Sequence, residues 1–495
     1  MRNRLLSLTA ILGYLGALFQ ISGFVLLIPL LVMLCYPGPG GNEVSPLCFL
    51  LPALAACALG FAAKKKFGPL RPLTSSGSML VCSLAWICVS AVGAVPFWMG
   101  LDVSFLDAYF EAVSGFTTTG ITMLQGLDAM PRSIIFWRSL TQWLGGLGIL
   151  SFFLTVAYAG GTAHQLFSAE SHKIASKRPA PGLFHTLKIL WGIYAAFTLL
   201  TALLLALEGM SIFDAIAHAL TALATGGYSP HDASIAYYRN AGYPHFVAIE
   251  YTLIFAMLLG GISFIVHYRV LTGQIKGLWD NTEMKLFWLI LGGSTLLVGI
   301  DHVVRFGLNN PSETGRDSLF QVVSILTTTG FVTKDIAAGY FPALAKQVFL
   351  ILMVIGGCVG STGGGLKVLR VGVLLKMVNR QIGRIVHGRS SVNLVLVDGD
   401  PVETEEVRRV SALFFAWMFL LVCGSGITAL LSDLPAMDAA SGMFSALGNI
   451  GPCYISVERM TQLHPVIKLT YIVGMLAGRL EILPVLLLFS RKAWR

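Results

Sequence analysis

The sequence predicts an all-α polytopic membrane protein that contains four similar re-entrant loops. Three observations lead to this fold class: the composition, a series of apolar runs, and a short motif that occurs four times. Only 12% of the 495 residues are charged, 55% are hydrophobic, and the mean hydropathy is +0.75. Because soluble domains carry about 25% charged residues, the chain is expected to lie mainly in lipid.

Apolar runs with few or no charges supply the expected membrane helices. Most reach the roughly 20 residues that a helix needs to cross a bilayer, whereas a β-barrel would show alternating segments of about 10 residues. Arg2 and Arg4 precede the first run as in a signal peptide, but a run of about thirty residues exceeds the roughly 7–15 of a signal peptide and favours a retained helix. The runs are Leu5–Leu34, Phe49–Ala63, Met79–Trp98, Ile134–Ala157, Leu187–Leu207, Phe246–Val266, Leu286–Ile300, Val348–Ile355, Val410–Leu431 and Val466–Phe489.

Lysine and arginine residues gather in groups between and after these runs. Positive residues collect in cytoplasmic loops, so the groups are expected to mark the cytoplasmic face, and the N-terminus is expected to lie there. A nucleic-acid partner would also explain basic loops, but the loop asymmetry of a membrane protein explains them more simply, and no nucleic acid is expected. The groups are Lys64, Lys65, Lys66 and Arg71; Lys173, Lys177 and Arg178; Arg269, Lys276 and Lys285; Arg370 to Arg409; and Arg491, Lys492 and Arg495.

One motif occurs four times without gaps. In each copy a Gly follows an Asp by 13 residues, and a hydroxyl residue stands seven positions after the Asp. The spacing between copies leaves room for two membrane helices in each repeat. The copies begin at Asp107, Asp214, Asp317 and Asp438, carry Ser114, Thr221, Ser324 and Ser445, and end at Gly120, Gly227, Gly330 and Gly451.

Each part of the motif has a physical role in a re-entrant loop. The Asp is expected to cap a helix, and the roughly ten residues after it make about 15 Å of helix, half of a bilayer. The negative end of that helix favours a cation. The Thr- and Gly-rich segment that follows can turn carbonyl oxygens towards a common axis, where they replace the hydration shell of K+. The alternative interpretation is that these segments are ordinary loops between helices. A single copy would fit that alternative well, but four copies in register make it much weaker.

A pair of small residues recurs in the helix after each loop, and the fourth repeat changes it. The pairs are Gly145-Gly146, Gly260-Gly261, Gly356-Gly357 and Gly478-Arg479. Small residues let helices approach closely, whereas an arginine inside a membrane helix is costly and should face a polar cavity. We therefore expect Arg479 to project into the conduction path below the loops, with Glu481 as a local partner. A structural arginine that binds backbone carbonyls is the alternative, and both roles can hold together.

The second helix of the third repeat is interrupted by a glycine-rich segment from Gly356 to Val368. Each glycine destabilises a helix by about 1 kcal/mol relative to alanine. A flexible loop is therefore expected directly under the four re-entrant loops, where it can block ion flow. A simple packing kink is the alternative, which Lys367 makes weaker. A phosphate-binding loop is rejected because the adjacent Gly-Lys-Ser/Thr and a preceding soluble strand are missing. The candidate gate residues are Gly357, Gly360, Ser361, Thr362, Gly363, Gly364, Gly365, Lys367 and Arg479.

These features together resemble the Trk/Ktr/HKT superfamily of K+ transporters, and most closely its TrkH-type membrane subunit. The resemblance covers about residues 70–490, and the two helices before residue 70 resemble the additional N-terminal pair of that subfamily. It implies four helix–pore-loop–helix repeats around a pseudo-fourfold pore. The expected units are residues 1–70 for the N-terminal pair, then 71–160, 161–275, 276–395 and 396–495 for repeats 1 to 4.

The resemblance also implies a selectivity filter in which backbone carbonyls bind K+. A Ser in place of the first filter glycine is associated with Na+ transport in plant relatives, so glycine in all four loops favours K+. The fourth loop, Gly448 to Cys453, departs most from the Thr-rich pattern. The implied filter residues are Thr118, Thr119 and Gly120; Thr225, Gly226 and Gly227; Thr328, Thr329 and Gly330; and Asn449, Ile450 and Gly451.

The resemblance further implies K+ uptake across the inner membrane of a bacterium. It implies a homodimer of pore subunits and a cytosolic TrkA-type nucleotide-binding subunit on the basic face. K+ is then the transported ion, no organic cofactor is expected in this chain, and nucleotide would act only through that second subunit.

Two other function classes compete with a pore. An alternating-access transporter of another monovalent cation or small solute also uses broken helices and internal repeats, but four repeats with the same order of elements favour a parallel, pore-like arrangement. An enzyme is not expected, because no HExxH, nucleophile elbow or intramembrane carboxylate pair is present. The eight cysteines form no CxxC pair, so no zinc site or disulfide framework is predicted.

Overall fold

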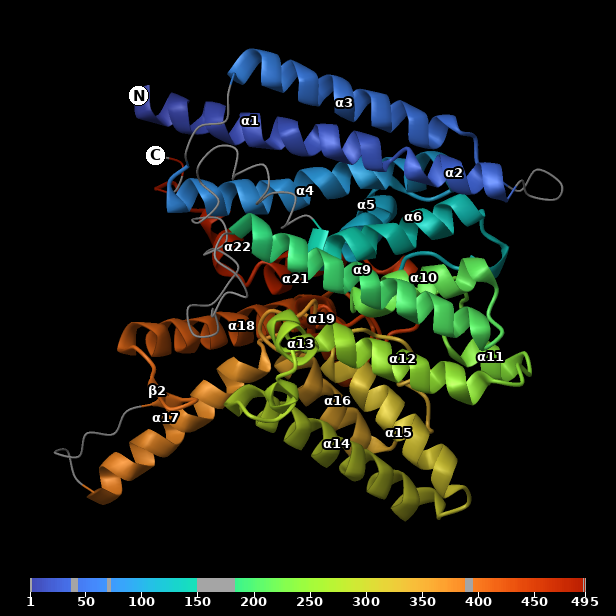
Figure 1. The fold of residues 1–495 in the computed structure, drawn as a ribbon, viewed down its shortest axis with the longest axis vertical. Coiled ribbons are helices and arrows are strands. Elements are labelled where there is room, and N and C mark those ends of the chain that lie inside the picture. Colours follow the sequence, from blue (N-terminus) through green and yellow to red (C-terminus); the bar gives the residue numbers. More distant parts are fainter. Residues whose placement is uncertain are drawn as a thin grey trace.

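The computed structural model describes residues 2–36, 43–68, 73–148, 183–387, 395–492 and 494. Most of its long helices lie side by side, while α17 (Val368–His387) extends away from the others (Figure 1). Two-residue strands, β1 (Leu396–Val397) and β2 (Asp400–Pro401), pair antiparallel beside the helices. The fold of the described residues is therefore helical apart from this ribbon.

Some predictions fall outside the described residues. These are the unit boundaries at residues 70/71 and 160/161, and the basic residues Arg71, Lys173, Lys177, Arg178 and Arg495.

An N-terminal hairpin of helices packs against the first repeat. It consists of α1 (Arg2–Val25), its continuation α2 (Ile28–Cys35), and α3 (Leu47–Phe67). Small residues bring α1 and α3 together, because a Cβ atom at Gly60 would overlap the side chain of Gln20.

In the described part of the chain, each of the four repeats has a long helix, a short helix, and a second helix that is irregular or broken. Repeat 1 contains α4 (Ser75–Gly100), α5 (Phe105–Phe116), η1 (Leu127–Ala129), α6 (Arg132–Trp143) and η2 (Leu144–Gly148). Repeat 2 contains α9 (Leu183–Leu207), α10 (Ile212–Leu223), α11 (Ala236–Asn240), α12 (Phe246–Gly261), α13 (Phe264–Leu271) and η4 (Ile275–Leu278). Repeat 3 contains α14 (Thr282–Phe306), α15 (Pro311–Leu326), α16 (Ala343–Ile355) and α17. Repeat 4 contains α18 (Thr404–Leu430), α19 (Ala436–Gly448), α20 (Val457–Gln462), α21 (Pro465–Arg479) and α22 (Leu483–Leu488).

The long helices can cross a membrane and the short ones cannot. Within the described residues, six helical segments are long and apolar enough to span it: Leu8–Cys35, Leu47–Phe67, Ser76–Gly100, His185–Leu207, Thr282–Phe306 and Thr404–Leu430. The short helices α5, α10, α15 and α19 have 12, 12, 16 and 13 residues. At 1.5 Å per residue they measure about 18–24 Å, less than the roughly 30 Å of hydrocarbon.

Within the described residues, the second helix departs from a regular α-helix in every repeat, although the sequence led us to expect an interruption only in the third. In repeat 1, α6 runs into the π-helical turn η2, and in repeat 2, α12 and α13 meet at a bend of 105°. In repeat 4, Glu481 and Ile482 take positive φ angles of 62° and 67° between α21 and α22. The small residues let the second helices pack against the short helices, because a Cβ at Gly145 or Gly478 would overlap a carbonyl at the end of the preceding short helix.

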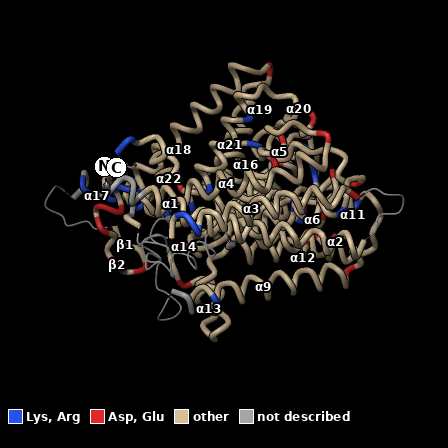
Figure 2. The backbone as a smooth tube through the Cα atoms, turned by 90° about the horizontal axis from the view of Figure 1, so that it is seen from above, with Lys and Arg blue, Asp and Glu red and all other residues tan. Residues whose placement is uncertain are grey.

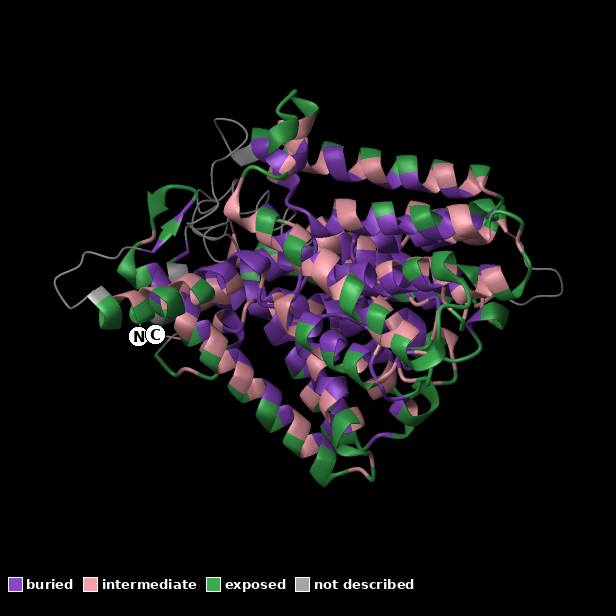
Figure 3. Ribbon diagram, turned by 90° about the horizontal axis from the view of Figure 1, so that it is seen from below, coloured by how far each residue is buried: buried purple, intermediate pink, exposed green. Residues whose placement is uncertain are grey.

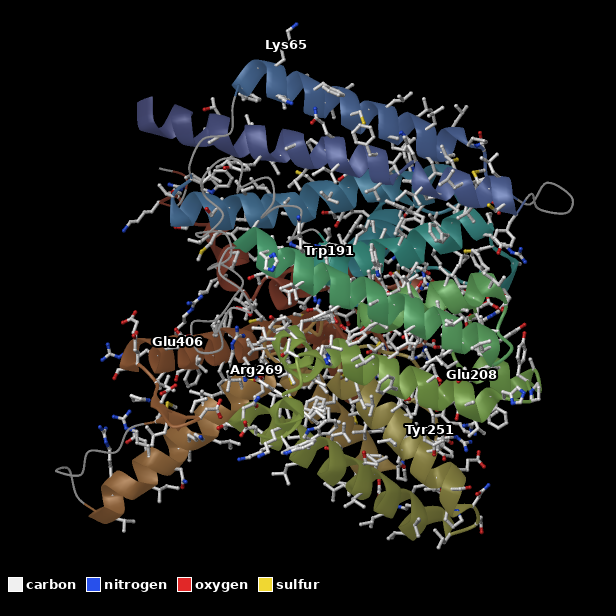
Figure 4. All side chains as sticks on the ribbon, in the orientation of Figure 1. Lys65, Trp191, Glu208, Tyr251, Arg269 and Glu406 are labelled. Atoms are coloured by element: carbon white, nitrogen blue, oxygen red, sulfur yellow. The ribbon has the colours of Figure 1, made fainter. Side chains whose placement is uncertain are left out.

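Burial and charge follow the axis of the bundle. Buried residues concentrate in its middle and exposed ones at its rim (Figure 3). Charged residues gather towards two opposite ends (Figure 2), and both termini lie at one of these ends (Figure 1). Lys65 and Glu406 lie towards the end with the termini, and Glu208 lies towards the opposite end (Figure 4).

Candidate functional site

The four loops that follow the short helices share one backbone conformation. The residue two before each motif glycine has a positive φ angle: 52° at Thr118, 52° at Thr225, 61° at Thr328 and 55° at Asn449. The glycines themselves have φ angles of 86°, 73°, 88° and 105° in repeats 1 to 4. A positive φ is uncommon for residues other than glycine, so its recurrence shows four copies of one structure. The fourth loop keeps this conformation despite its different sequence.

A backbone hydrogen bond holds each loop against its own helix. The carbonyl of the hydroxyl residue in the motif accepts it, and the N–H of the residue before the motif glycine donates it. The bonds run from Thr119 to Ser114 (2.8 Å), Gly226 to Thr221 (2.9 Å), Thr329 to Ser324 (2.8 Å) and Ile450 to Ser445 (3.0 Å). Because these carbonyls lie at the helix end, where no helical partner remains, the bonds fix the irregular backbone without loss of pairing.

The four loops meet in a closed ring, in cyclic order. Each motif glycine faces the carbonyl oxygen of the residue that precedes the glycine in the next repeat. A Cβ at Gly120 would overlap the oxygen of Gly226, one at Gly227 that of Thr329, one at Gly330 that of Ile450, and one at Gly451 would lie 2.9 Å from that of Thr119. The ring therefore requires glycine at all four positions, and it has pseudo-fourfold symmetry.

The motif aspartates of the first two repeats do not cap their helices, which corrects the expectation from the sequence. Ser104 caps α5 and Ser211 caps α10. Each serine hydroxyl accepts the backbone N–H of the aspartate three residues later, Asp107 or Asp214, at 3.1 Å. The aspartates therefore occupy the first turn, where a negative charge still favours the helix N-terminus.

The same correction applies to the other two repeats. Asp438 lies three residues after Pro435, the cap position of α19. Asp317 lies further inside α15, because that helix begins at Pro311 after the cap residue Asn310.

Two of the aspartates form ion pairs between repeats. Lys468, on α21 of repeat 4, lies 2.5 Å from Asp107 of repeat 1. Arg239, on α11 of repeat 2, lies 2.6 Å from Asp317 of repeat 3, whose side chain is fully buried. Breaking a buried ion pair by removing one partner is strongly destabilising. These pairs therefore tie neighbouring repeats together around the ring.

Asp214 has a histidine partner in the loop that follows its own short helix. The His231 ring lies 3.5 Å from Asp214 and 2.5 Å from Asp128 of repeat 1, and it stacks on Tyr237 at 3.5 Å between centroids. Burial alone would lower the pKa of His231, but hydrogen bonds to the two carboxylates raise it above its usual 6.5.

The glycine-rich loop between α16 and α17 is docked on the base of the ring. Thr328 Oγ1 accepts a hydrogen bond from the Gly364 N–H at 2.7 Å, and Thr225 Oγ1 lies 3.2 Å from Thr362 Oγ1. A Cβ at Gly364 would lie 2.6 Å from the carbonyl oxygen of Gly448, at the end of the fourth short helix. The loop thus contacts three of the four repeats, and its glycines permit the close approach.

The remaining residues of this loop form hydrogen bonds and packing contacts with nearby residues. Two loop carbonyls accept backbone N–H groups: Gly360 accepts from Phe264 and Gly357 accepts from Val368, at 3.0 Å each. Two side chains donate to carbonyls within the loop: Ser361 Oγ to Cys358 at 2.6 Å, and the Lys367 ammonium to Gly363. Gly365 packs against Gly356.

Arg479 joins the loop to the first and fourth repeats. Its Nη1 donates to the Thr362 carbonyl at 2.6 Å, and its Nη2 donates to the carbonyls of Gly145 and Gly146 at 2.7 Å. Glu481, expected as a local partner, forms an ion pair with Arg370 at 2.7 Å. Arg479 therefore binds backbone carbonyls, as the structural interpretation expected. One of these carbonyls belongs to the glycine-rich loop and two belong to the π-helical turn η2 of repeat 1.

Comparison with known proteins places this arrangement in a family. Residues 53–494 match the model of the TrkH cation transport proteins. The chain belongs to the TrkH family. It is 34% identical over 500 residues to the Trk system potassium uptake protein TrkH of Escherichia coli K12, with 99% of both chains covered. The corresponding protein of Vibrio parahaemolyticus is 33% identical over 501 residues, again with 99% of both chains covered.

A solved structure confirms the predicted fold class. The crystal structure of the potassium transporter TrkH from Vibrio parahaemolyticus matches with a TM-score of 0.84 at 30% identity, covering 99% of this chain and 100% of that chain. The family is one of cation transporters and not of enzymes, as the sequence predicted.

A buried ion pair behind the first loop of this TrkH protein was not among the predicted residues. Arg138 on α6 lies 2.6 Å from Glu111 on α5, and its guanidinium lies 3.4 Å from the ring centroid of Tyr228, just beyond the second loop. Arg138 Nη1 also donates to the Ser229 carbonyl at 3.0 Å. An arginine inside the apolar run Ile134–Ala157 is the signal that could have found it, because intramembrane charges need a partner.

A neutral side chain on the same helix was also missed. Gln142 is fully buried, and its amide binds the backbone of the second loop at Gly226 and Tyr228. A polar residue three positions before the glycine pair was its signal in the sequence.

Proposed function

We propose that this protein takes up K+ through a carbonyl-lined selectivity filter formed by the closed ring of four loops. The observation that carries the proposal is the cyclic contact of each motif glycine with a carbonyl of the next loop. Rings of backbone carbonyls can replace the hydration shell of K+. The relatives named as potassium uptake proteins support K+ as the ion.

The proposed filter residues are the twelve that the sequence suggested. The recurrence of the same positive φ angles at the first and third residue of each set of three supports the assignment, because equivalent φ angles turn the carbonyls of four loops in the same sense. The negative ends of four short helices converge on the ring, which favours a cation there.

The proposed gate is the loop from Gly357 to Lys367 together with Arg479. The loop lies against the base of the ring, and Arg479 ties its Thr362 carbonyl to carbonyls of the first repeat. A loop in this position obstructs the pathway, so ions pass only when these contacts open.

The proposed assembly is a homodimer in a bacterial inner membrane, regulated by a cytosolic nucleotide-binding subunit. The basic groups at the end that carries the termini support a cytoplasmic docking face there. The names of the relatives refer to a Trk system, which is consistent with more than one component.

Ion flux into proteoliposomes tests the filter. We expect the purified chain to carry K+ and Rb+ in preference to Na+ under an imposed potential, and Gly330→Val to abolish the flux because its side chain would overlap the Ile450 carbonyl. Gly339→Val is the matched control, because a Cβ at Gly339 meets nothing within 4 Å.

Each other outcome of this measurement has a definite meaning. Equal Na+ flux would keep the pore and overturn its selectivity. Absence of flux even with the cytosolic subunit added would favour the alternating-access transporter.

A further inference from the structure

One inner helix carries an amide where the equivalent positions of the others carry a thioether. The position three residues before the first small residue of each pair is Gln142 in repeat 1 and Met257, Met353 and Met475 in repeats 2 to 4. All four side chains are fully buried. Methionine has no N–H to donate, whereas glutamine both donates and accepts hydrogen bonds.

Gln142 reaches from repeat 1 to the second loop of the ring. Its Nε2 donates to the Gly226 carbonyl at 2.6 Å, and its Oε1 accepts the Tyr228 N–H at 3.0 Å. The two bonds lie on either side of Gly227, the motif glycine of that loop. They fix the orientation of the amide, because the reverse orientation would place two oxygens together and two donors together.

The residue opposite Gln142 also differs from its equivalents. The position before the motif glycine is Thr119, Thr329 or Ile450 in the other loops but Gly226 in the second. A Cβ at Gly226 would overlap the carboxamide of Gln142. Glutamine held in this position on the helix therefore requires glycine in the loop.

The first loop shows the alternative combination. Asn449 Nδ2 donates both to Thr119 Oγ1 and to the Met475 carbonyl, at 2.9 Å each. Met475 therefore stands beside the first loop as Gln142 stands beside the second. There the loop residue has a side chain and the helix residue cannot donate.

The Gly226 carbonyl is one of the four carbonyls of the ring. In the part of the chain that the structure describes, it accepts a hydrogen bond, whereas the other three ring carbonyls accept none. Glycine has more backbone freedom than threonine or isoleucine. In the other loops the side chain restricts the backbone that carries the ring oxygen. In the second loop the two bonds of Gln142 supply that restriction from outside.

We infer that Gln142 is a specificity-determining residue, which holds the Gly226 carbonyl in the orientation that the ring needs to prefer K+ to Na+. The inference rests on the proposed carbonyl filter and adds a residue outside the loops to it. Gln142 acts through Gly226, so it is a positioning residue and not a ligand of the ion.

The test compares four proteins in proteoliposomes: the wild type, Gln142→Met, the double variant Gln142→Met with Gly226→Thr, and the control Gln125→Met. The control makes the same chemical change at an exposed loop residue. We expect Gln142→Met to lower the K+/Na+ permeability ratio about fivefold, the equivalent of about 1 kcal/mol for one neutral hydrogen bond. The double variant reproduces the methionine and threonine of the other repeats and should recover the ratio.

Several results would overturn the inference. An unchanged ratio in Gln142→Met, or a double variant no more selective than the single one, would show that the amide only fills space. If Gln142→Met fails to fold while the double variant folds and is selective, the second loop depends on Gln142 and the inference stands. If neither folds, Gln142 is a packing residue and the inference is wrong.

The same experiment separates this inference from the proposed function. A wild type without K+ preference would contradict the filter itself. A selective wild type that loses flux in Gly330→Val but keeps its ratio in Gln142→Met would contradict only the role of Gln142.

Discussion

At the residue scale, the unusual backbone of four non-glycine residues decides the geometry of the ring. Thr118, Thr225, Thr328 and Asn449 all hold positive φ angles next to a glycine that also has one. Such conformations cost free energy and persist only where surrounding contacts enforce them. Here the bond to the helix end and the neighbouring loop enforce them, so the strain is concentrated where we propose that ions bind.

The contacts of Arg479 give a prediction at this scale. Arg479→Ala should raise K+ flux in the absence of any cytosolic subunit, because the loop loses the bond from Arg479 to the Thr362 carbonyl. A hydrogen bond from a charged group is worth about 1.5–3 kcal/mol, so the open fraction should rise by about one to two orders of magnitude while the closed state predominates. Tracer flux into proteoliposomes measures the change.

Arg459→Ala is the matched control, since Arg459 lies exposed on α20. Unchanged or lower flux in a folded Arg479→Ala protein would contradict the idea that this arginine holds the loop closed.

At the scale of elements, the short helices are positioned by charges as well as by apolar packing. The aspartate in or near the first turn of α5 and of α15 pairs with a cation from another repeat, and that of α10 pairs with His231. Each pair fixes the position of the N-terminal part of a short helix and therefore helps to orient the helix dipole. The motif aspartate is thus a link within the ring assembly, where the sequence alone suggested a helix cap.

The contacts of His231 predict a pH dependence of stability. The pKa of His231 is raised by Asp214 and Asp128, although burial opposes the shift. Stabilisation by a group with a raised folded pKa is complete below its unfolded pKa of about 6.5 and is lost as the pH rises through the folded value. We therefore expect the thermal unfolding midpoint in detergent to fall as the pH rises above about 6.5.

The variant His231→Gln should flatten this part of the pH profile, and His245→Gln, at an exposed position, should leave it unchanged. A profile that keeps its slope in His231→Gln would assign the dependence to another group.

At the scale of the whole molecule, the two largest apolar core clusters each draw mainly on two repeats. One joins α1, α3, α4, α5 and α6 chiefly with α18 to α22, and the other is built chiefly from α9 to α16. The ring, the glycine-rich loop and Arg479 lie where these two pairs of repeats meet. Apolar contacts also cross this boundary, because Trp143 of α6 stacks on Tyr194 of α9.

The placement of charge predicts the orientation in the membrane. The termini lie at one end, with Lys65 towards the same end (Figures 1 and 4), and cytoplasmic loops carry the excess of lysine and arginine. Alkaline phosphatase fused after Asp102 should be active outside the cytoplasm, and the same enzyme fused after Phe67 should be inactive. The opposite pattern would invert the proposed topology.

The sequence by itself determined the class of the protein, the four copies of the loop and the position of the interruption in the second helix of the third repeat. These features are local or periodic: apolar length, a constant Asp-to-Gly spacing, and glycine runs with low helix propensity. The shared register of four segments also identified the glycines that meet in the ring. The sequence did not predict which residues of the ring contact each other.

Only the tertiary structure decided which residues join the repeats. The bonds of Gln142 to Gly226, Arg239 to Asp317 and Arg479 to Thr362 connect positions 84, 78 and 117 residues apart. No spacing rule in one sequence links such residues, because their partners are set by how whole helices pack around the centre. The aspartates show the consequence: their local pattern fitted a helix cap, but another residue holds the cap position in each repeat. Asp107, Asp214 and Asp317 instead pair with a lysine, a histidine and an arginine that the folded chain brings near.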